Sequence, residues 1–359
     1  NNNITVRVYD NDFIVQSYGT PLSPTYGLVT PTIPAGYYDS LEGLSGNALK
    51  QAVQDIIANP AVVRAHNYGD IEFILKEADK NPLNSNQVWQ MYVESPKPIL
   101  DYQTGSSNIG VWNREHIFPQ SRGGFSGGTS STADGIGVWL PTNADDILSG
   151  HADAHHLRAE DGAENSTRSN RDYGSDYNGP IGSQGSWNGD VSRALFYMAV
   201  RYNGLNLVNG NPSDAIVGQI GDLATLLTWN TTDPRDDFEM NRNNYIYTWQ
   251  MNRNPFIDYP NLADYIFGAN FGQQWFSTLS TQNPIENRVV VYPNPASEYL
   301  IVSGLEGSSK VEIYTITGQL VQSQDFNNEI HINLDLHVGM YLVKVTNGSQ
   351  STTKKIIVK

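Results

Sequence analysis

The pattern of hydrophobic residues changes near residue 285, and this change constrains the fold more than any other feature of the 359-residue chain. Beyond it, short runs of alternating apolar and polar residues are separated by turn sequences such as Asn294-Pro295 and Thr317-Gly318. A period of two is typical of strands that bury one face. Residues 285–359 are therefore predicted to form a small all-β sandwich.

Upstream of this change, apolar residues recur at the spacing of an α-helix. Four segments show this period: Leu49 to Ile57, Ile71 to Ala78, Val191 to Tyr202, and Ile220 to Leu227. Pro60 is predicted to end the first helix, and Asp70 and Asp190 are predicted to cap the second and third. The centre of the chain between the second and third helices is rich in Gly, Ser, Asn and Asp. Residues 35–284 are therefore predicted to form a mixed α+β domain that is mainly helical.

Residues 1–34 differ from both of these regions. Ile4, Val6 and Val8 alternate with polar residues and predict a single strand, and four prolines between Pro21 and Pro34 predict a linker. We expect this segment to be the remnant of a strand followed by a Pro-rich linker. The chain has no apolar run of 18 residues, so no membrane span is predicted.

The charge balance is acidic, with 22 Lys and Arg against 37 Asp and Glu and a formal net charge of −15. This sign argues against long-range attraction to nucleic acid. The absence of cysteine excludes disulfides, a thiolate zinc site and a cysteine nucleophile. Histidine is scarce, yet four of the seven histidines fall within 41 positions: His116, His151, His155 and His156.

The residues around these histidines suit the hydrolysis of a phosphodiester. That reaction needs a base to deprotonate water, and a neutral histidine such as His116 provides one near neutral pH. It also needs a divalent cation and arginine to offset the charge on the phosphate. Glu115 and Asn165 carry oxygen ligands of the kind that Mg²⁺ prefers. Neighbouring side chains in an extended segment point to opposite faces, so Glu115 can hold the metal while His116 activates water.

Residues from about 36 to 276 resemble the bacterial endonuclease I family, secreted nucleases of the His-Me finger type. The motifs that carry the resemblance are WNREHIFPQSRGG (112–124), DAHHLRAEDGAENSTRSN (153–170), GDVSRALFYMAVRY (189–202) and DDFEMNRNNYIY with NRNPFIDYP (236–260). The resemblance implies a ββα-metal finger in which Glu115 and Asn165 hold Mg²⁺, with Ca²⁺ or Mn²⁺ as substitutes. It also implies that His116 is the general base and that Arg168 contacts the phosphate. The expected products are 5′-phosphorylated fragments of DNA, and also of RNA, with little sequence preference.

Further residues are expected to contact the substrate: Arg114, Arg122, His155, His156, Arg158, Asn170 and Arg253. Two alternatives remain open for the sequence, since His151, His155 and His156 could instead bind zinc, and residues 252–254 could tie the last helix to the core. One of His155 and His156 is also a candidate for orienting the finger. Between residues 98 and 285 the chain has ten Arg and no Lys. We expect a cluster of arginines around His116 that gives the cleft a positive local charge, opposite to the negative net charge of the whole chain.

The C-terminal region resembles the sorting domain of type IX secretion, which Bacteroidetes use for export across the outer membrane. The motifs are VYPNPASEYLIV (291–302), VEIYTITGQLV (311–321), LHVGMYLVKV (336–345) and TTKKIIVK (352–359). The resemblance implies recognition by the type IX machinery and a secreted or cell-surface location. We therefore expect a monomeric extracellular endonuclease. The alternative is a catalytically weak surface module that binds nucleic acid or matrix.

Overall fold

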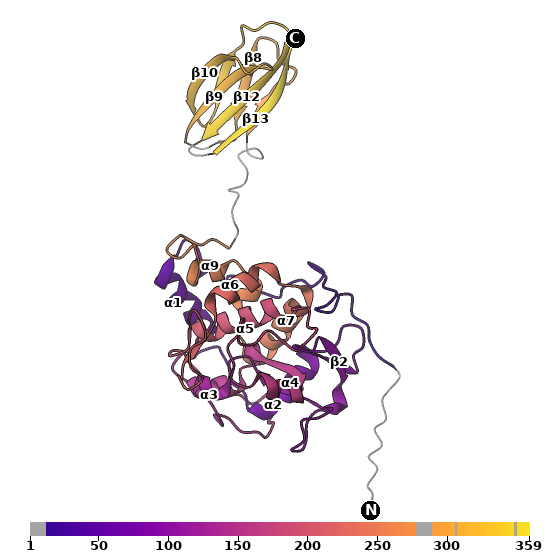
Figure 1. Ribbon diagram of the computed structural model, residues 1–359. Coiled ribbons are helices and arrows are strands. Elements are labelled where there is room, and N and C mark those ends of the chain that lie inside the picture. The colour runs from indigo at the N-terminus through magenta and orange to yellow at the C-terminus, as the bar shows by residue number, and fades with distance from the viewer. Residues whose placement is uncertain (1–11, 278–288, 306, 348–349) are drawn as a thin grey trace, which may run out of the picture. The chain divides into compact units, whose positions relative to one another are not determined.

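The computed structural model describes residues 12–277, 289–305, 307–347 and 350–359. The chain divides into two compact units, Asn1–Ser277 and Thr278–Lys359, and each is described by itself (Figure 1). The predicted strand at Ile4 to Val8 lies outside the described residues, as does the chain immediately around residue 285.

The first unit is built around one buried helix. Its longer helices are α1 (Gly46–Ile57), α2 (Tyr68–Ala78), α5 (Asn188–Arg201), α6 (Leu223–Thr232) and α7 (Asp237–Gln250), and its short helices are α3 (Gln120–Gly123), α4 (Gly162–Arg168), α8 (Pro255–Asp258) and α9 (Leu262–Ile266). Helix α5 lies in the middle of the unit, and α1, α6 and α8 pack against it (Figure 1). Every residue of α5 from Gly189 to Arg201 is buried, so this helix forms the centre of the core.

Three of the predicted helices are confirmed, and the fourth begins at Leu223 rather than at Ile220, which lies in a short strand (Gln219–Ile220). Neither Asp70 nor Asp190 is itself the N-cap residue. Helix α1 spans the predicted segment and ends before Pro60. Helix α2 begins at Tyr68, where the Asn67 side chain accepts from the Asp70 backbone while the Asp70 side chain accepts from Asn67 N–H. Asp190 likewise lies inside the first turn of α5 rather than before it. Both acidic side chains therefore lie in the first turn of a helix, where their negative charge complements the helix dipole.

Three short sheets complete the first unit: antiparallel β1 (Gln87–Gln90) with β2 (Ser95–Pro98), antiparallel β3 (Trp112–His116) with β4 (Leu157–Asp161), and parallel β5 (Asn206–Leu207) with β6 (Gln219–Ile220). Among the described residues of this unit, loops and strands take up more of the chain than helices do. The unit is therefore a mixture of α and β structure, and the prediction that it is mainly helical is not confirmed.

The pair of strands β3 and β4 positions the candidate functional residues Glu115 and His116. In its register, Glu115 lies opposite Arg158 and His116 lies opposite Leu157. Helix α4 follows β4 directly, and the Asp161 carboxylate caps it by accepting from the backbone of Ala163 and Glu164. Residues that are about 50 positions apart in the sequence are thereby fixed against one another.

The second unit consists of two antiparallel sheets. One has the order β10-β9-β12-β13 and the other β11-β8-β7. Their bounds are β7 (Val290–Tyr292), β8 (Tyr299–Ser303), β9 (Ser308–Thr315), β10 (Leu320–Asn327), β11 (Ile330–Asn333), β12 (Gly339–Asn347) and β13 (Gln350–Val358). Residues of both sheets, such as Leu300, Val311 and Val343, form one buried hydrophobic cluster. The predicted all-β character of this region is confirmed for the described residues, and β10 has mostly exposed side chains.

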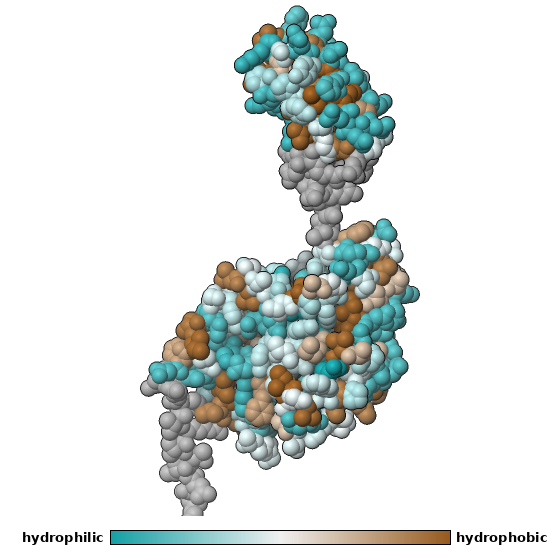
Figure 2. All heavy atoms as spheres, turned by 180° about the vertical axis from the view of Figure 1, so that it is seen from behind, coloured by the Kyte–Doolittle hydropathy of each residue, from teal (hydrophilic) through white to brown (hydrophobic). Residues whose placement is uncertain are grey.

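The visible surface is mixed in polarity. On the face shown in Figure 2, hydrophobic residues form small separate groups among polar ones. Within the described ranges, no helix combines the length and the apolar character that a membrane span requires.

Candidate active site

A cavity of about 380 Å³ lies where β3, α3 and α4 meet. Its walls are formed by Arg114, Glu115, His116, Pro119, Gln120, Ser121, Ser126, Asn165, Ser166, Ser169 and Asn170. The fold thus brings together five of the residues predicted from the sequence, namely Arg114, Glu115, His116, Asn165 and Asn170. It does not bring the other predicted residues to this wall.

His116 lies at the end of β3 and is only 6% exposed. Its Nε2 is 2.9 Å from the carbonyl oxygen of His151, which can only accept, so Nε2 carries the proton. Its Nδ1 is then the acceptor, and the Gln120 side-chain amide donates to it over 3.1 Å. Gln120 lines the cavity, so the lone pair of His116 is on the cavity side of the ring.

The surroundings of His116 keep its ring neutral. Burial lowers the pKa of His116 well below its usual range, and His156, His151 and Arg114 act in the same direction. The hydrogen bond to the His151 carbonyl opposes this shift without reversing it. A neutral imidazole with its proton fixed on Nε2 and an accepting Nδ1 is the form that a general base requires.

Glu115 is 2% exposed and reaches the same cavity. Its Oε1 accepts from the Tyr92 hydroxyl at 2.8 Å and lies 3.4 Å from Nη1 of Arg168. Burial raises the pKa of Glu115 to about 7, although Arg168 and the Tyr92 hydroxyl both lower it. A cation bound at this carboxylate would favour its charged form.

Asn165 presents an amide oxygen to the cavity from α4. Its Nδ2 donates to Oδ1 of Asn113 at 2.8 Å and, more weakly, to the carbonyl of Arg114 at 3.4 Å. These two acceptors fix which end of the amide is the nitrogen. In the part of the chain that the structure describes, no group donates to the remaining Oδ1 of Asn165. One carboxylate and one free amide oxygen at a wet cavity form a donor set that suits Mg²⁺, which keeps several of its own waters.

The histidines do not form a comparable metal site. Nε2 of His155 contacts the Asn252 carbonyl at 3.2 Å, and Nε2 of His156 contacts the Gly150 carbonyl at 2.7 Å. Nδ1 of His151 accepts from the backbone and hydroxyl of Thr129. No group of three His, Cys, Asp or Glu side chains in the described ranges is placed to hold a metal ion.

Arg168 lies in a different place from the predicted one. Its side chain is buried, and its guanidinium donates to the carbonyls of His116 at 3.1 Å and Ile117 at 2.7 Å. It also lies over the Tyr173 ring, 4.5 Å from the ring centroid. The expected phosphate contact stays a prediction, and in this structure the guanidinium holds the end of β3 and offsets the charge of Glu115.

Three further arginines that were expected at the substrate are also neutralised inside the fold. Arg122 pairs with Asp172 at 2.9 Å and with Asp214 at 3.2 Å. Arg253 is bound by both oxygens of Asp258, each at 2.7 Å. Buried guanidinium groups need such partners, since an unpaired buried charge is costly.

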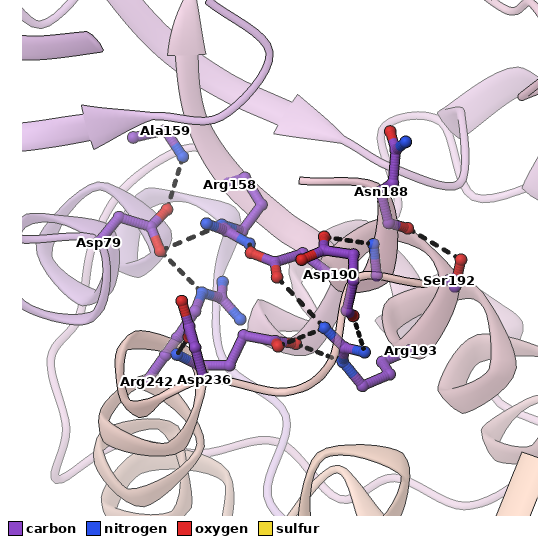
Figure 3. Close-up of polar contacts among 12 residues, drawn as sticks. Asp79, Arg158, Ala159, Asn188, Asp190, Ser192, Arg193, Asp236 and Arg242 are labelled. Carbon is purple, nitrogen blue, oxygen red and sulfur yellow. Dashed lines mark hydrogen bonds and ion pairs between the residues drawn. The ribbon is translucent and has the colours of Figure 1, made fainter. Parts of the chain in front are cut away.

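Arg158 belongs to a larger buried network (Figure 3). Its guanidinium contacts Asp79 at 3.3 Å and Asp190 at 2.7 Å, and Asp79 also binds Arg242 (Figure 3). Although Arg158 lies opposite Glu115 in the strand register, its charge is balanced away from the cavity. Its expected contact with the substrate stays a prediction, and in this structure Arg158 joins β4 to α2, α5 and α7.

Arg114 is the exception among the predicted arginines. It is half-buried, lines the cavity and lies 3.5 Å over the centroid of the Tyr68 ring. Its Nη1 donates to the Tyr68 carbonyl, and no carboxylate within the described residues pairs with it. Two arginines lie near His116: Arg114 lines the cavity, and Arg168 reaches the His116 carbonyl from inside the fold.

His155 and His156 lie in the short turn directly before β4, and both rings are buried. Their burial predicts how the free energy of unfolding depends on pH. Burial lowers the pKa of both His155 and His156 to about 4, although Asp153 opposes the shift. The unfolded chain therefore binds protons below about pH 6.5 that the folded chain does not, and the free energy of unfolding falls as the pH drops toward 4. We expect each ring to contribute roughly 1–2 kcal/mol of this loss between pH 7 and pH 5.

Urea unfolding of the wild type and of His155→Gln at pH 7 and pH 5 tests this dependence. The comparison between the two proteins cancels the titration of other groups. The loss of stability between the two pH values should be smaller in His155→Gln, and an equal loss in both proteins would contradict the prediction.

Residues that the sequence analysis missed hold the predicted ones in place. The Tyr92 hydroxyl donates to Glu115 and lies 2.6 Å from the hydroxyl of Tyr173, which in turn donates to the Ile117 carbonyl. The Tyr68 ring lies against the rings of both His116 and His151. Gln120 had a usable signal, since it follows His116 by four positions within the same motif. Tyr92 and Tyr68 had none, because they come from distant segments that carry no motif.

Comparisons with known proteins identify the family of each part of the chain. The sequence model of the family described as Endonuclease I matches residues 45–185 and 180–261, more than half of the chain. The model described as a secretion system C-terminal sorting domain matches residues 290–359.

Two curated relatives are each named extracellular ribonuclease. The one from Bacillus amyloliquefaciens is 37% identical over 285 residues, covering 73% of this chain and 89% of the relative. The one from Bacillus subtilis (strain 168) is 36% identical over 252 residues, covering 64% of this chain and 78% of the relative.

Among solved structures, one that concerns PorZ, a surface component of the type-IX secretion system of Porphyromonas gingivalis, covers 24% of this chain and 13% of that chain. It is 22% identical with a TM-score of 0.21, which supports no structural conclusion.

The enzyme interpretation is therefore confirmed over that of a binding module, and the sorting domain gives a secreted or cell-surface location. The chain belongs to the endonuclease I family of nucleases.

Proposed function

We propose that this nuclease is a metal-dependent endonuclease that hydrolyses DNA and RNA with little sequence preference and leaves 5′-phosphorylated products. The observation that carries the proposal is the neutral ring of His116, whose unprotonated Nδ1 is on the cavity side. Glu115 and Asn165 supply oxygen ligands at the same cavity. We further propose that residues 35–284 form the nuclease domain and residues 285–359 the sorting domain.

His116 acts on the attacking water. Nδ1 takes one proton from a water molecule in the cavity, which replaces the Gln120 amide as its partner, while the His151 carbonyl holds the proton on Nε2 and so fixes the ring. The water oxygen forms a bond to phosphorus, and the bond from phosphorus to the 3′ oxygen breaks. The products are a 5′-phosphate and a 3′-hydroxyl, and the 3′ oxygen takes up a proton from solvent.

Glu115 and Asn165 are the residues that would hold a divalent cation. When bound, such an ion supplies positive charge to the phosphate and to the leaving oxygen. The Tyr92 hydroxyl and Arg168 keep Glu115 in position, and the Asn113 side chain orients Asn165. On this proposal β3, β4 and α4 are the strands and helix of the ββα-metal finger.

Arg114 is the proposed contact to the phosphate. Its guanidinium is held by the Tyr68 ring and carbonyl, neither of which cancels its charge. A planar guanidinium binds two phosphate oxygens at once, so a single arginine can orient the group under attack. RNA is included among the substrates because both curated relatives are named ribonucleases.

Removal of divalent cations tests the metal. The full chain is incubated with supercoiled plasmid and, separately, with a long RNA, each with EDTA or with added Mg²⁺, Mn²⁺ or Ca²⁺. We expect EDTA to lower the rate of cleavage at least tenfold and Mg²⁺ to restore it.

The variant Asn165→Asp provides the control, since it retains an oxygen ligand. It should remain sensitive to EDTA, whereas Asn165→Ala should lose most of the response to added metal. Cleavage at the full rate in EDTA would overturn the metal proposal.

A further inference from the structure

We propose that Trp139 and Arg64 form a second nucleotide subsite, on which an unpaired base of the substrate stacks against Trp139 while Arg64 contacts its phosphate. This inference rests on the proposed function, because it concerns how the same nuclease holds its substrate beyond the scissile bond. It is carried by the exposure of one tryptophan, by an arginine that pairs with no carboxylate, and by the path of one loop.

Trp139 is unlike the other tryptophans of the chain. Six of the seven are less than 10% exposed, whereas Trp139 is 50% exposed. It is surrounded in the sequence by other exposed apolar side chains, namely Ile136, Val138 and Leu140 at 50%, 48% and 40%. A large aromatic side chain that remains in water is a common feature of binding surfaces.

Arg64 lies over this ring. Its guanidinium carbon is 4.7 Å from the centroid of Trp139. The one hydrogen bond that the guanidinium makes to a described residue is long, 3.4 Å, to the Val63 carbonyl. No carboxylate among the described side chains forms an ion pair with it. Unlike Arg122, Arg158 and Arg253, it therefore retains a charge that a phosphate could bind.

The loop that carries Trp139 is fixed to the catalytic cavity at its other end. Ser126 lines the cavity, and the Thr129 hydroxyl accepts from the backbone of Tyr68 at 3.0 Å. The same Thr129 binds His151, whose carbonyl holds His116. The start of the loop is thus part of the wall of the active site.

From there the loop follows the start of α2. The Asp70 carboxylate accepts from the backbone of Asp134 at 3.1 Å and of Gly135 at 2.7 Å. Leu140 and Ala65 then exchange two backbone hydrogen bonds, of 2.7 Å and 3.1 Å. These contacts place Trp139 beside Arg64 and hold the pair on a rigid base.

Gly69 shows how closely the loop and the helix approach. A Cβ atom at this position would lie 2.2 Å from the backbone nitrogen of Ala133. Only glycine permits this contact, so the position of the loop depends on the residue next to Tyr68.

Residues 64–68 take part in two contacts between an arginine and an aromatic ring. At one end Arg64 covers Trp139, and at the other Arg114 covers Tyr68 at the cavity wall. Five residues span at most about 18 Å, which is the reach of a few nucleotides of a single strand. Two arginines without a carboxylate partner among the described residues, each over an aromatic ring, are therefore within reach of one short single strand.

The occupant is an unpaired base rather than a duplex. Stacking on an aromatic side chain requires a base whose face is free, and the bases of a duplex already stack on one another. Stacking is tolerant of sequence because every base has such a face, which agrees with a nuclease of little sequence preference.

Steady-state cleavage of three substrates tests the subsite. These are a single-stranded oligonucleotide, a blunt duplex of the same length, and bis(p-nitrophenyl) phosphate, which carries no neighbouring nucleotide. We expect Trp139→Ala to raise KM for the single strand roughly tenfold with little change in kcat, as for the loss of one base stack. Trp139→Phe should recover most of this loss, and the small substrate should not respond.

The matched control is Phe73→Ala on α2. Phe73 is also 50% exposed and also lies under a cation, since Nζ of Lys76 is 5.3 Å from its centroid. This change should not alter KM. An equal rise in KM for Phe73→Ala, or an equal effect of Trp139→Ala on the small substrate or the duplex, would overturn the subsite.

A binding measurement separates this inference from the catalytic proposal. In a His116→Ala background with EDTA, a single-stranded oligonucleotide should quench the tryptophan emission, and Trp139→Phe should abolish that quenching. Two results would overturn the subsite whether or not the metal proposal holds. One is quenching that persists after Trp139→Phe, and the other is no quenching in the His116→Ala protein that retains Trp139. Failure of the metal proposal alone would leave the quenching intact.

Discussion

Replacement of His116 by alanine is expected to lower kcat by roughly 10²–10⁴-fold, the contribution typical of a positioned general base. The change removes the one lone pair that the structure places on the cavity side of the ring, at Nδ1. KM should change little, because His116 acts on water rather than on the substrate. Initial rates with plasmid and with RNA, under saturating Mg²⁺, measure the effect.

His331→Ala is the control for loss of an imidazole. Its side chain is 64% exposed in the second unit, so its removal should leave the rate unchanged. Urea unfolding must show that His116→Ala is folded under the assay conditions, since the ring also packs against Tyr68 and Phe125. A folded His116→Ala protein with more than a tenth of the original rate would show that another group is the base.

Replacement of Arg253 by methionine is expected to lower the free energy of unfolding of the first unit by about 3–5 kcal/mol, as for other broken buried ion pairs. Both oxygens of Asp258 bind Arg253, and the pair is buried. Without the guanidinium, the carboxylate would remain in the core with only Tyr38 and Asn243 as donors. Urea unfolding followed by circular dichroism measures the loss.

Two further variants isolate the cause. Arg253→Met combined with Asp258→Asn should recover part of the stability, because the neutral amide can still accept from the Tyr38 hydroxyl. Arg235→Met, a half-buried arginine without an ion pair in the described ranges, should cost less than about 0.5 kcal/mol. If Arg253→Met instead raised KM while leaving the unfolding curve unchanged, Arg253 would be a substrate contact as the sequence suggested.

The helices that could be predicted are those whose buried face is apolar. Helices α1 and α5 carry a clear stripe of Leu, Val, Ile and Ala, and the period of that stripe is visible without a structure. Helix α7 was missed because it buries polar side chains, among them Asp237, Arg242 and Asn243. Such residues are normally found at the surface, and only the partners that other segments supply make their burial favourable.

The prediction of the site is limited for the same reason, because the partners of its polar residues come from distant segments. Glu115, His116 and Asn165 could be found because one strand and the helix after its partner strand bring them together, and their motifs are local. The arginines could not be assigned, because a paired and a free guanidinium look the same in the sequence. Arg122 meets Asp172 and Arg158 meets Asp79, and only the fold brings these distant carboxylates to them.

The internal pairing of the arginines has a consequence for how the enzyme degrades a polymer. Many of the arginines of the first unit that could bind a phosphodiester backbone form ion pairs with carboxylates of the protein. Affinity for such a backbone comes mainly from cations that have no such partner. We therefore expect a fragment to be held only briefly after each cut. This favours a distributive enzyme, which makes scattered cuts along many chains, over a processive one that follows a single chain to its end.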